Sequence, residues 1–137
     1  MNNLDVQALR SGGVVALVLA VPFSFAARWI ADNGNSSGAA TWLSLLALIS
    51  FVLGAGVAAW VQQRRLPLMH GIVCAVVTYL VAQAVFIVIR LVLGRDVHWF
   101  AALFNLTAVV AAGLLGGFLG SLLQRRGFTP GSLGRGR

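Results

Sequence analysis

The chain has 137 residues, of which 59% are hydrophobic and only 9% are charged, with a formal net charge of +7. Because soluble domains carry roughly a quarter charged residues, so few charges cannot cover a water-exposed surface, and an ordinary soluble protein is excluded. The basic residues are all arginines that cluster between apolar runs, a pattern that orients membrane helices and does not follow nucleic-acid phosphates. We therefore expect a membrane protein that does not bind nucleic acid.

Four apolar runs follow one another along the chain, and each is long enough to cross a bilayer as a helix. They cover about residues 12–31, 39–61, 71–93 and 100–123. A backbone inside lipid must satisfy its own hydrogen bonds, and the runs lack the two-residue alternation of barrel strands. The sequence therefore predicts an all-α polytopic membrane protein with four transmembrane helices in one domain, residues 1–123. The Arg- and Gly-rich tail, residues 124–137, is expected to be disordered.

The arginines predict how these helices are oriented. On one side of the membrane we expect seven of them, against three at most on the other, and the seven are Arg10, Arg64, Arg65, Arg125, Arg126, Arg135 and Arg137. Positively charged loops stay in the cytoplasm, so both termini should be cytoplasmic and the protein should be a multi-pass protein of the bacterial cytoplasmic (inner) membrane. The first run is longer than the apolar region of a usual signal peptide, which favours a retained helix over a cleaved leader.

The two halves of the sequence resemble each other. A shift of 61 residues places Gln63-Arg64-Arg65 on Gln124-Arg125-Arg126 and Gly56 on Gly117. We therefore predict two tandem hairpins, each closed on the inner side by Gln-Arg-Arg. Parallel repeats of this kind relate by an axis along the membrane normal. Identities between apolar residues arise easily by chance, so duplication and coincidence both stay open as explanations.

Four polar side chains within the runs are candidates for a polar pathway: Arg28, Gln83, Arg90 and Asn105. Both arginines fall near the outer ends of their runs, where a long side chain can extend to the lipid headgroups. The alternative is an outward-facing basic vestibule for an anion. For the amides, interhelical hydrogen bonds are the common role in membranes, and a lined pathway is the functional alternative.

Small residues repeat at a spacing of four in the second and fourth runs. Lipid gives no hydrophobic drive between helices, so small residues that admit close backbone approach mark helix interfaces. We predict a tight contact in the inner half of the fourth helix, either within the chain or between protomers. The predicted packing residues are Gly54, Ala58, Gly113, Gly116, Gly117, Gly120 and Ser121.

Residues that carry catalysis or hold metals are scarce. The chain has no Glu, its three Asp lie outside the apolar centres, and one cysteine, Cys74, excludes an intrachain disulfide. His70, at the start of the third run, has no other metal-ligand residue beside it in the sequence. We predict no catalytic site, no cofactor, no metal and no enzyme activity.

The segments Gly54-Ala55-Gly56, Gln63-Arg64-Arg65 and His70-Gly71 resemble those of small uncharacterised four-helix membrane proteins of bacteria, of the actinobacterial type. The resemblance implies a fold and a membrane location but no activity. We expect a structural or interaction subunit, with a small-solute or ion channel or transporter as the alternative. Expected partners are a second copy of the chain or another membrane protein, together with anionic headgroups of the lipid bilayer, which should bind at Arg64, Arg65, Arg125 and Arg126.

Overall fold

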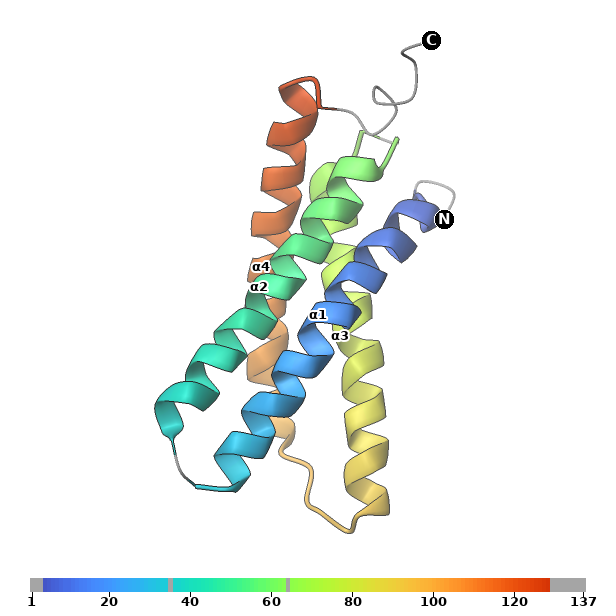
Figure 1. The fold of residues 1–137 in the computed structure, drawn as a ribbon. Helices are drawn as coiled ribbons and strands as arrows, with labels where there is room; N and C mark the ends of the chain where they lie inside the picture. The colour runs from blue at the N-terminus through green and yellow to red at the C-terminus, as the bar shows by residue number, and fades with distance from the viewer. Residues whose placement is uncertain (1–3, 35, 64, 129–137) are drawn as a thin grey trace.

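The computed structural model describes residues 4–34, 36–63 and 65–128, which form four α-helices joined by short turns (Figure 1). The helices are α1 (Val6–Asp32), α2 (Ser37–Val61), α3 (Pro67–Val92) and α4 (Trp99–Arg125). Each helix is long and apolar enough to cross a membrane. The prediction of an all-α, four-helix membrane protein is therefore confirmed.

The helices extend beyond most of the predicted apolar limits because local capping, and not hydropathy, decides where a helix begins and ends. The Asp5 carboxylate accepts hydrogen bonds from the backbone N–H groups of Gln7 and Ala8, so α1 begins six residues before the predicted limit. Pro67 occupies the first turn of α3, where its missing N–H costs nothing. At the other end of the chain, α4 includes residues 124 and 125 of the predicted tail, and residues 129–137 of that tail lie outside the described residues.

α3 and α4 end in the same backbone motif. Gly94 and Gly127 follow their caps with φ values of +64° and +80°, a conformation that glycine adopts without a steric penalty. In α3 the N–H of Arg95 then donates to the carbonyl of Arg90 at 2.9 Å, which completes a Schellman motif. The motif stops α3 sharply and starts the loop that carries Arg95.

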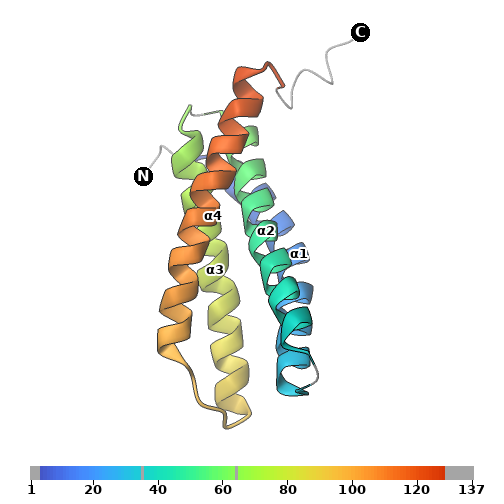
Figure 2. The ribbon, with the colours of Figure 1, turned by 90° about the vertical axis from the view of Figure 1, so that its left-hand side faces the viewer.

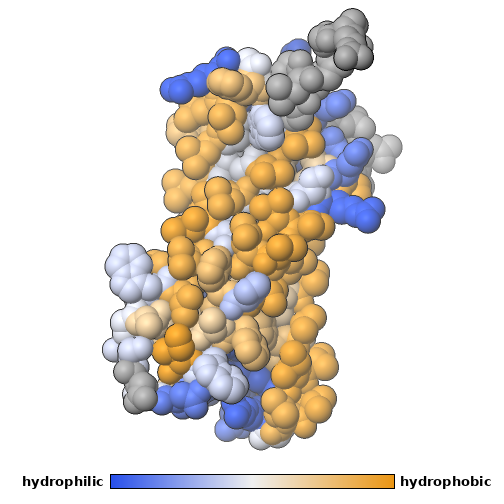
Figure 3. All heavy atoms as spheres, in the orientation of Figure 1, coloured by the Kyte–Doolittle hydropathy of each residue, from blue (hydrophilic) through white to orange (hydrophobic). Residues whose placement is uncertain are grey.

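The helices run alternately up and down, and the hairpins α1–α2 and α3–α4 lie side by side (Figures 1 and 2). We call the end that holds the start of α1 and the end of α4 the terminal end, and the end that holds the α1–α2 and α3–α4 connections the loop end. Hydrophobic residues cover the flank of the bundle, and hydrophilic residues gather toward the two ends (Figure 3).

The two hairpins do not obey a strict twofold symmetry. α2 and α3 both contact all three other helices, whereas α1 and α4, which are described throughout, make no contact with each other. A twofold axis along the bundle would relate the α2–α3 contact to an equal contact between α4 and α1. The structure therefore supports the pairing into hairpins, while the duplication inferred from the sequence stays a hypothesis.

Glycines bring the helix backbones into direct contact in the half of the bundle near the terminal end. Between α1 and α2, a Cβ built on Gly54 would lie 2.6 Å from the carbonyl oxygen of Gly12. Between α3 and α4, a Cβ built on Gly71 would lie 2.7 Å from the carbonyl oxygen of Gly113. Real Cβ atoms do not approach so closely, so each hairpin depends on glycine at these positions.

The same kind of contact joins one hairpin to the other, between α2 and α4. A Cβ on Gly120 would lie 2.7 Å from the carbonyl oxygen of Gly56, and a Cβ on Gly116 would lie 2.8 Å from the Gly56 nitrogen. The predicted packing residues thus lie in contacts within one chain. Those that are buried are Gly54, Ala58, Gly113, Gly116, Gly117 and Gly120, whereas Ser121 is half-buried and donates to the Phe118 carbonyl at 2.7 Å.

A buried histidine ties the start of α1 to the start of α3 at the terminal end. His70 is fully buried, and its Nε2 accepts the backbone N–H of Asp5 at 2.8 Å. Because a backbone N–H can only donate, the ring proton is on Nδ1, which donates to the Leu66 carbonyl at 2.8 Å. His70 is therefore neutral in this arrangement, and both of its ring nitrogens hold backbone groups that cap helices.

Gln124 makes the equivalent link between α4 and the end of α2. Its side-chain Nε2 donates to the carbonyls of Trp60 at 2.9 Å and Gln62 at 3.1 Å, at the end of α2, where the last carbonyls of a helix need partners from elsewhere. The side chains of Gln62 and Gln124 also contact each other at 3.4 Å. The terminal end is therefore stabilised both by glycine contacts and by part-buried hydrogen bonds.

We expect His70→Phe to lower the free energy of unfolding by about 2 kcal/mol, because it leaves the Asp5 N–H without its partner and removes one of the two hydrogen bonds to the Leu66 carbonyl, which keeps the backbone N–H of residue 70. The measurement is unfolding in mixed micelles of nonionic detergent and dodecyl sulfate. His98→Phe, at an exposed position, is the control and should change stability by less than about 0.5 kcal/mol. Equal losses in the two variants would contradict a structural role for the buried imidazole.

Candidate functional site

Toward the loop end the two hairpins separate (Figure 2), and a cavity of about 520 Å³ lies between the four helices. The hairpins separate beyond the last glycine contacts, at the level where large side chains lie between the helices. The rings of Phe51 and Tyr79 meet edge to face there, with centroids 6.3 Å apart, and pack with Val109 in the buried core. These three side chains also line the cavity, so they form its floor and close it off from the terminal end.

The cavity changes from apolar to cationic along its length. Leu17 and Phe51 line its deep part and lie 15 and 14 residues from the loop ends of their helices, about 20 Å at 1.5 Å per residue. Arg28 lies four residues from the end of α1, about 6 Å from it. A molecule inside would therefore meet apolar walls at the floor and a guanidinium near the mouth.

Arg28 is half-buried and held across the gap between the hairpins. Its guanidinium carbon lies 4.4 Å from the centroid of the Phe86 ring, a cation–π contact between α1 and α3. Within the described ranges no carboxylate lies within ion-pair distance of Arg28, and its electrostatic neighbours include the like-charged Arg90. The contact with Phe86 holds the charge beside the cavity, so the side chain does more than extend to the headgroups.

Arg90 lines a second space of about 340 Å³ that adjoins the first. The two spaces share Arg28, Gln83, Phe86 and Asn105 among their lining residues. All four residues predicted for a polar pathway, Arg28, Gln83, Arg90 and Asn105, therefore line one or both of these adjoining spaces. They come from α1, α3 and α4.

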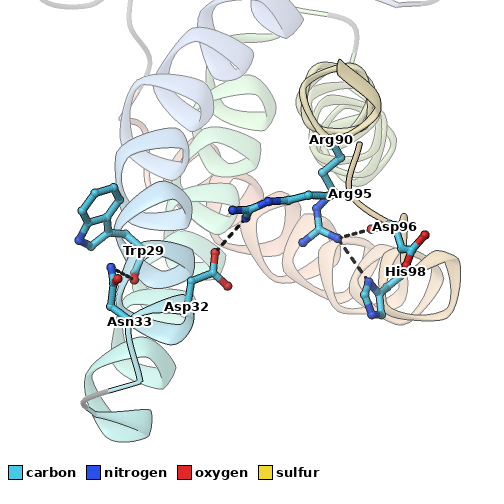
Figure 4. Close-up of polar contacts among 7 residues, drawn as sticks. All are labelled: Trp29, Asp32, Asn33, Arg90, Arg95, Asp96 and His98. Atoms are coloured by element: carbon cyan, nitrogen blue, oxygen red, sulfur yellow. Dashed lines mark hydrogen bonds and ion pairs between the residues drawn. The ribbon is translucent and has the colours of Figure 1, made fainter. Parts of the chain in front are cut away.

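Loop residues fix the Arg90 guanidinium at the mouth of the cavity (Figure 4). Its Nη1 donates to the carbonyl of Asp96 at 2.8 Å and lies 3.3 Å from Nδ1 of His98. Because a guanidinium can only donate, Nδ1 of His98 is the acceptor in this contact. The sequence did not identify His98 as a partner of Arg90, since the two are eight residues apart across the turn that follows α3.

An ion pair crosses the mouth of the cavity between the hairpins. Nη1 of Arg95 lies 3.5 Å from a carboxylate oxygen of Asp32, as Figure 4 shows, and the two side chains are 65% and 67% exposed. An ion pair this exposed contributes at most about 1 kcal/mol to stability. It places a cation beside Asp32, a carboxylate that also interacts electrostatically with Arg28.

The amides of Gln83 and Asn105 offer hydrogen bonds to the cavity. Neither side chain bonds to another residue in the part of the chain that the structure describes, so the interhelical hydrogen bonds common in membranes are not made here. No side-chain nitrogen or oxygen among the described residues is both buried and without a partner, so these amides are accessible. They can donate to, or accept from, a molecule in the cavity.

The hydroxyl groups in the cavity wall are largely occupied. Tyr79 donates to the Ala102 carbonyl at 2.8 Å, and Thr41 and Ser44 each donate to the carbonyl four residues earlier at 2.9 Å. These residues were not predicted as site residues from the sequence. The polar groups that can still bind a ligand therefore include the guanidinium of Arg28, the remaining N–H groups of Arg90, the two amides and the hydroxyl of Ser24.

The chemistry of the lining suits an anion. Among the residues that the structure describes, no Asp or Glu lines either space, whereas Arg28 lines both and Arg90 lines the second. Across residues 4–34, 36–63 and 65–128, no group of three His, Cys, Asp or Glu could hold a metal ion.

No family model, curated protein or solved structure matches the chain. The fold and the site define a class of protein, a four-helix multi-pass membrane protein with a cationic cavity at one end of the bundle. A function has to be inferred from the geometry of that cavity. The actinobacterial-type resemblance stays a prediction from the sequence.

Proposed function

We propose that the chain is a multi-pass protein of the bacterial cytoplasmic membrane that binds an anion in its loop-end cavity from the outer side, as a binding protein or carrier. The observation that supports this proposal best is that Arg28, Arg90, Gln83 and Asn105 line two adjoining spaces whose walls contain no acidic side chain among the described residues. An anion there would replace lost hydration with charge-assisted hydrogen bonds, which are the strong ones in a low dielectric.

The closed terminal half favours a one-sided site over an open channel. Glycine contacts join α1 to α2, α3 to α4 and α2 to α4 below the cavity floor. A ligand that enters at the loop end therefore meets a packed barrier. A carrier would have to separate these contacts to release the ligand on the other side, whereas a binding protein would keep them closed.

The structural or interaction subunit predicted from the sequence stays the alternative. Most of the small residues predicted to form an interface pack within the chain, as Gly54, Ala58, Gly113, Gly116, Gly117 and Gly120 do. A partner would have to dock on the large apolar side chains that face the lipid. Purification in mild detergent with mass measurement of the intact complex tests this alternative, and a stoichiometric unrelated partner would favour it.

The proposed orientation places the terminal end in the cytoplasm. Arg10, Arg65, Arg125 and Arg126 are exposed at that end, where anionic headgroups of the inner leaflet would bind them, and Arg64 lies outside the described residues. A reporter that is active only outside the cytoplasm should be silent when fused after Arg137 and active when inserted between α1 and α2. The opposite result would invert the topology and move the cavity to the cytoplasmic face.

Protection of an introduced thiol tests the anion site. Ser44 lines the cavity, so Ser44→Cys should react with N-ethylmaleimide, and the buried Cys74 of the parent chain should not. We expect phenyl phosphate to slow the reaction several-fold. Phenyltrimethylammonium has a similar size but the opposite charge and should have no effect. Equal protection by both compounds, or by neither, would contradict anion binding in this cavity.

A further inference from the structure

We infer that the occupant of the cavity is an anionic amphiphile, with one phosphate or carboxylate head bound at Arg28 and Arg90 and a single apolar chain that extends to the floor. The inference rests on the proposed anion site and adds the class of ligand. It comes from the order of residues along the cavity, because Leu17 and Phe51 line its deep part and Arg28 lies near its mouth.

The floor and lower wall are apolar. Leu17, Leu48, Phe51 and Val109 line this part, one or more from each of α1, α2 and α4, and the hydroxyl of Tyr79 is already bonded to a backbone carbonyl. A hydrated inorganic anion could make no hydrogen bonds there and would leave this apolar surface in contact with water. A hydrocarbon chain would remove the apolar surface from water, which is favourable.

The upper wall is suited to an oxyanion head. The guanidinium of Arg28 and the amides of Gln83 and Asn105 line both spaces, and the guanidinium of Arg90 lines the second. Guanidinium groups bind phosphate and carboxylate through parallel hydrogen bonds. A free phosphate and a lipid headgroup have this chemistry in common, so the tail has to distinguish them.

The depth of the cavity limits the length of the chain. Leu17 lies 11 residues before Arg28 on α1, about 16 Å along the helix axis. An extended alkyl chain advances about 1.3 Å per carbon, given C–C bonds near 1.5 Å, so about twelve carbons would span this depth. A chain of ten carbons should therefore fit, and a three-carbon chain should leave the floor empty.

The experiment measures how a series of compounds protects Ser44→Cys from N-ethylmaleimide in phosphatidylcholine nanodiscs. The compounds are inorganic phosphate, propyl phosphate, decyl phosphate and decanol, the last of which reports on partitioning into the lipid alone. Because each buried CH2 adds to affinity, decyl phosphate should protect at a concentration at least about tenfold lower than propyl phosphate. Decanol should not protect.

A second variant tests where the chain lies. Ala108 lines the lower cavity on α4, so Ala108→Leu should fill that space and raise the concentration of decyl phosphate needed for protection toward that of propyl phosphate. Protection by propyl phosphate should stay the same. Ala111→Leu, on the same helix at an exposed position outside the cavity wall, is the control and should change neither value.

The outcomes separate this inference from the proposal on which it rests. If propyl and decyl phosphate protect equally, the amphiphile is contradicted and the anion site stands. If no phosphate compound protects, or if decanol protects as well as decyl phosphate, the anion site fails and the inference fails with it. An effect of Ala111→Leu equal to that of Ala108→Leu would contradict the placement of the chain in the cavity.

Discussion

Gly116→Ala is expected to lower the free energy of unfolding by about 3 kcal/mol, the upper range for overpacking. A Cβ at Gly116 would collide with the carbonyl oxygen of Val52 and would lie 2.7 Å from the Cβ of Ala55 and 2.8 Å from the nitrogen of Gly56. Two of these three atoms belong to the backbone of α2, which cannot move aside as a flexible side chain can. The steric overlap can be removed only if α2 moves away from α4, and this movement would weaken the contact between the hairpins.

Gly56→Ala is the matched control, because it places the same methyl group on the other side of the same helix pair. There the nearest atom is the carbonyl oxygen of Gly116 at 3.5 Å, an ordinary contact. Alanine also favours the helix over glycine by about 1 kcal/mol, so this variant should be neutral or more stable. The measurement is the unfolding midpoint in mixed micelles, and similar losses in both variants would contradict the close packing of Gly116.

Arg28→Gln should raise the concentration of phenyl phosphate that protects Ser44→Cys by roughly 10- to 100-fold. The guanidinium is half-buried and held by Phe86 without a carboxylate partner among the described residues, so its charge is available to the anion. A hydrogen bond to a charged group contributes about 1.5–3 kcal/mol, and about 1.4 kcal/mol corresponds to a factor of ten in affinity. Adding Arg90→Gln should abolish protection in the accessible concentration range.

Two further variants show whether the effect is specific to the site. Arg10→Gln removes an exposed charge at the terminal end and should leave protection unchanged. Arg28→Lys retains the charge but loses the planar group that stacks on Phe86, so we expect an intermediate value. If Arg10→Gln weakens protection as much as Arg28→Gln, net charge explains the result and the cavity does not.

The sequence was sufficient to predict the four helices, because their apolar runs are long and polar groups are rare within membrane spans. Arg28, Gln83, Arg90 and Asn105 were selected because each interrupts an apolar run, and in the structure they line two adjoining spaces. Their rarity singled them out as candidates, and their role stays a prediction. Rarity did not predict that the amides would face a cavity instead of a neighbouring helix.

The links between distant segments could not be predicted from local patterns. The bond between Asp5 and His70 joins residues 65 positions apart, and Gln124 caps a helix that ends more than 60 residues earlier. Each needs the order of helices around the bundle, which no periodicity encodes. For the same reason the sequence could not decide whether the contacts of Gly116 were internal or between protomers, since a small residue fits both.

The position and volume of the cavity depend on where along the bundle the large side chains of different helices meet. Phe51 on α2 and Tyr79 on α3 lie beside each other only because the two helices are antiparallel and in this register. One turn of displacement would bring a ring opposite an alanine or glycine and would change where the hairpins separate. Register between helices is a tertiary property, so neither the floor nor the volume of the cavity was predictable from the sequence.

Reaction of Ser44→Cys with charged, membrane-impermeant thiol reagents tests the cationic, one-sided cavity most directly. A negatively charged and a positively charged methanethiosulfonate are added to membrane vesicles of either orientation, and each rate is divided by the rate with a free thiol. We expect reaction from the outer side only, with the negative reagent favoured after this correction. Reaction from the cytoplasmic side, or a preference for the positive reagent, would contradict an outward-facing anion site.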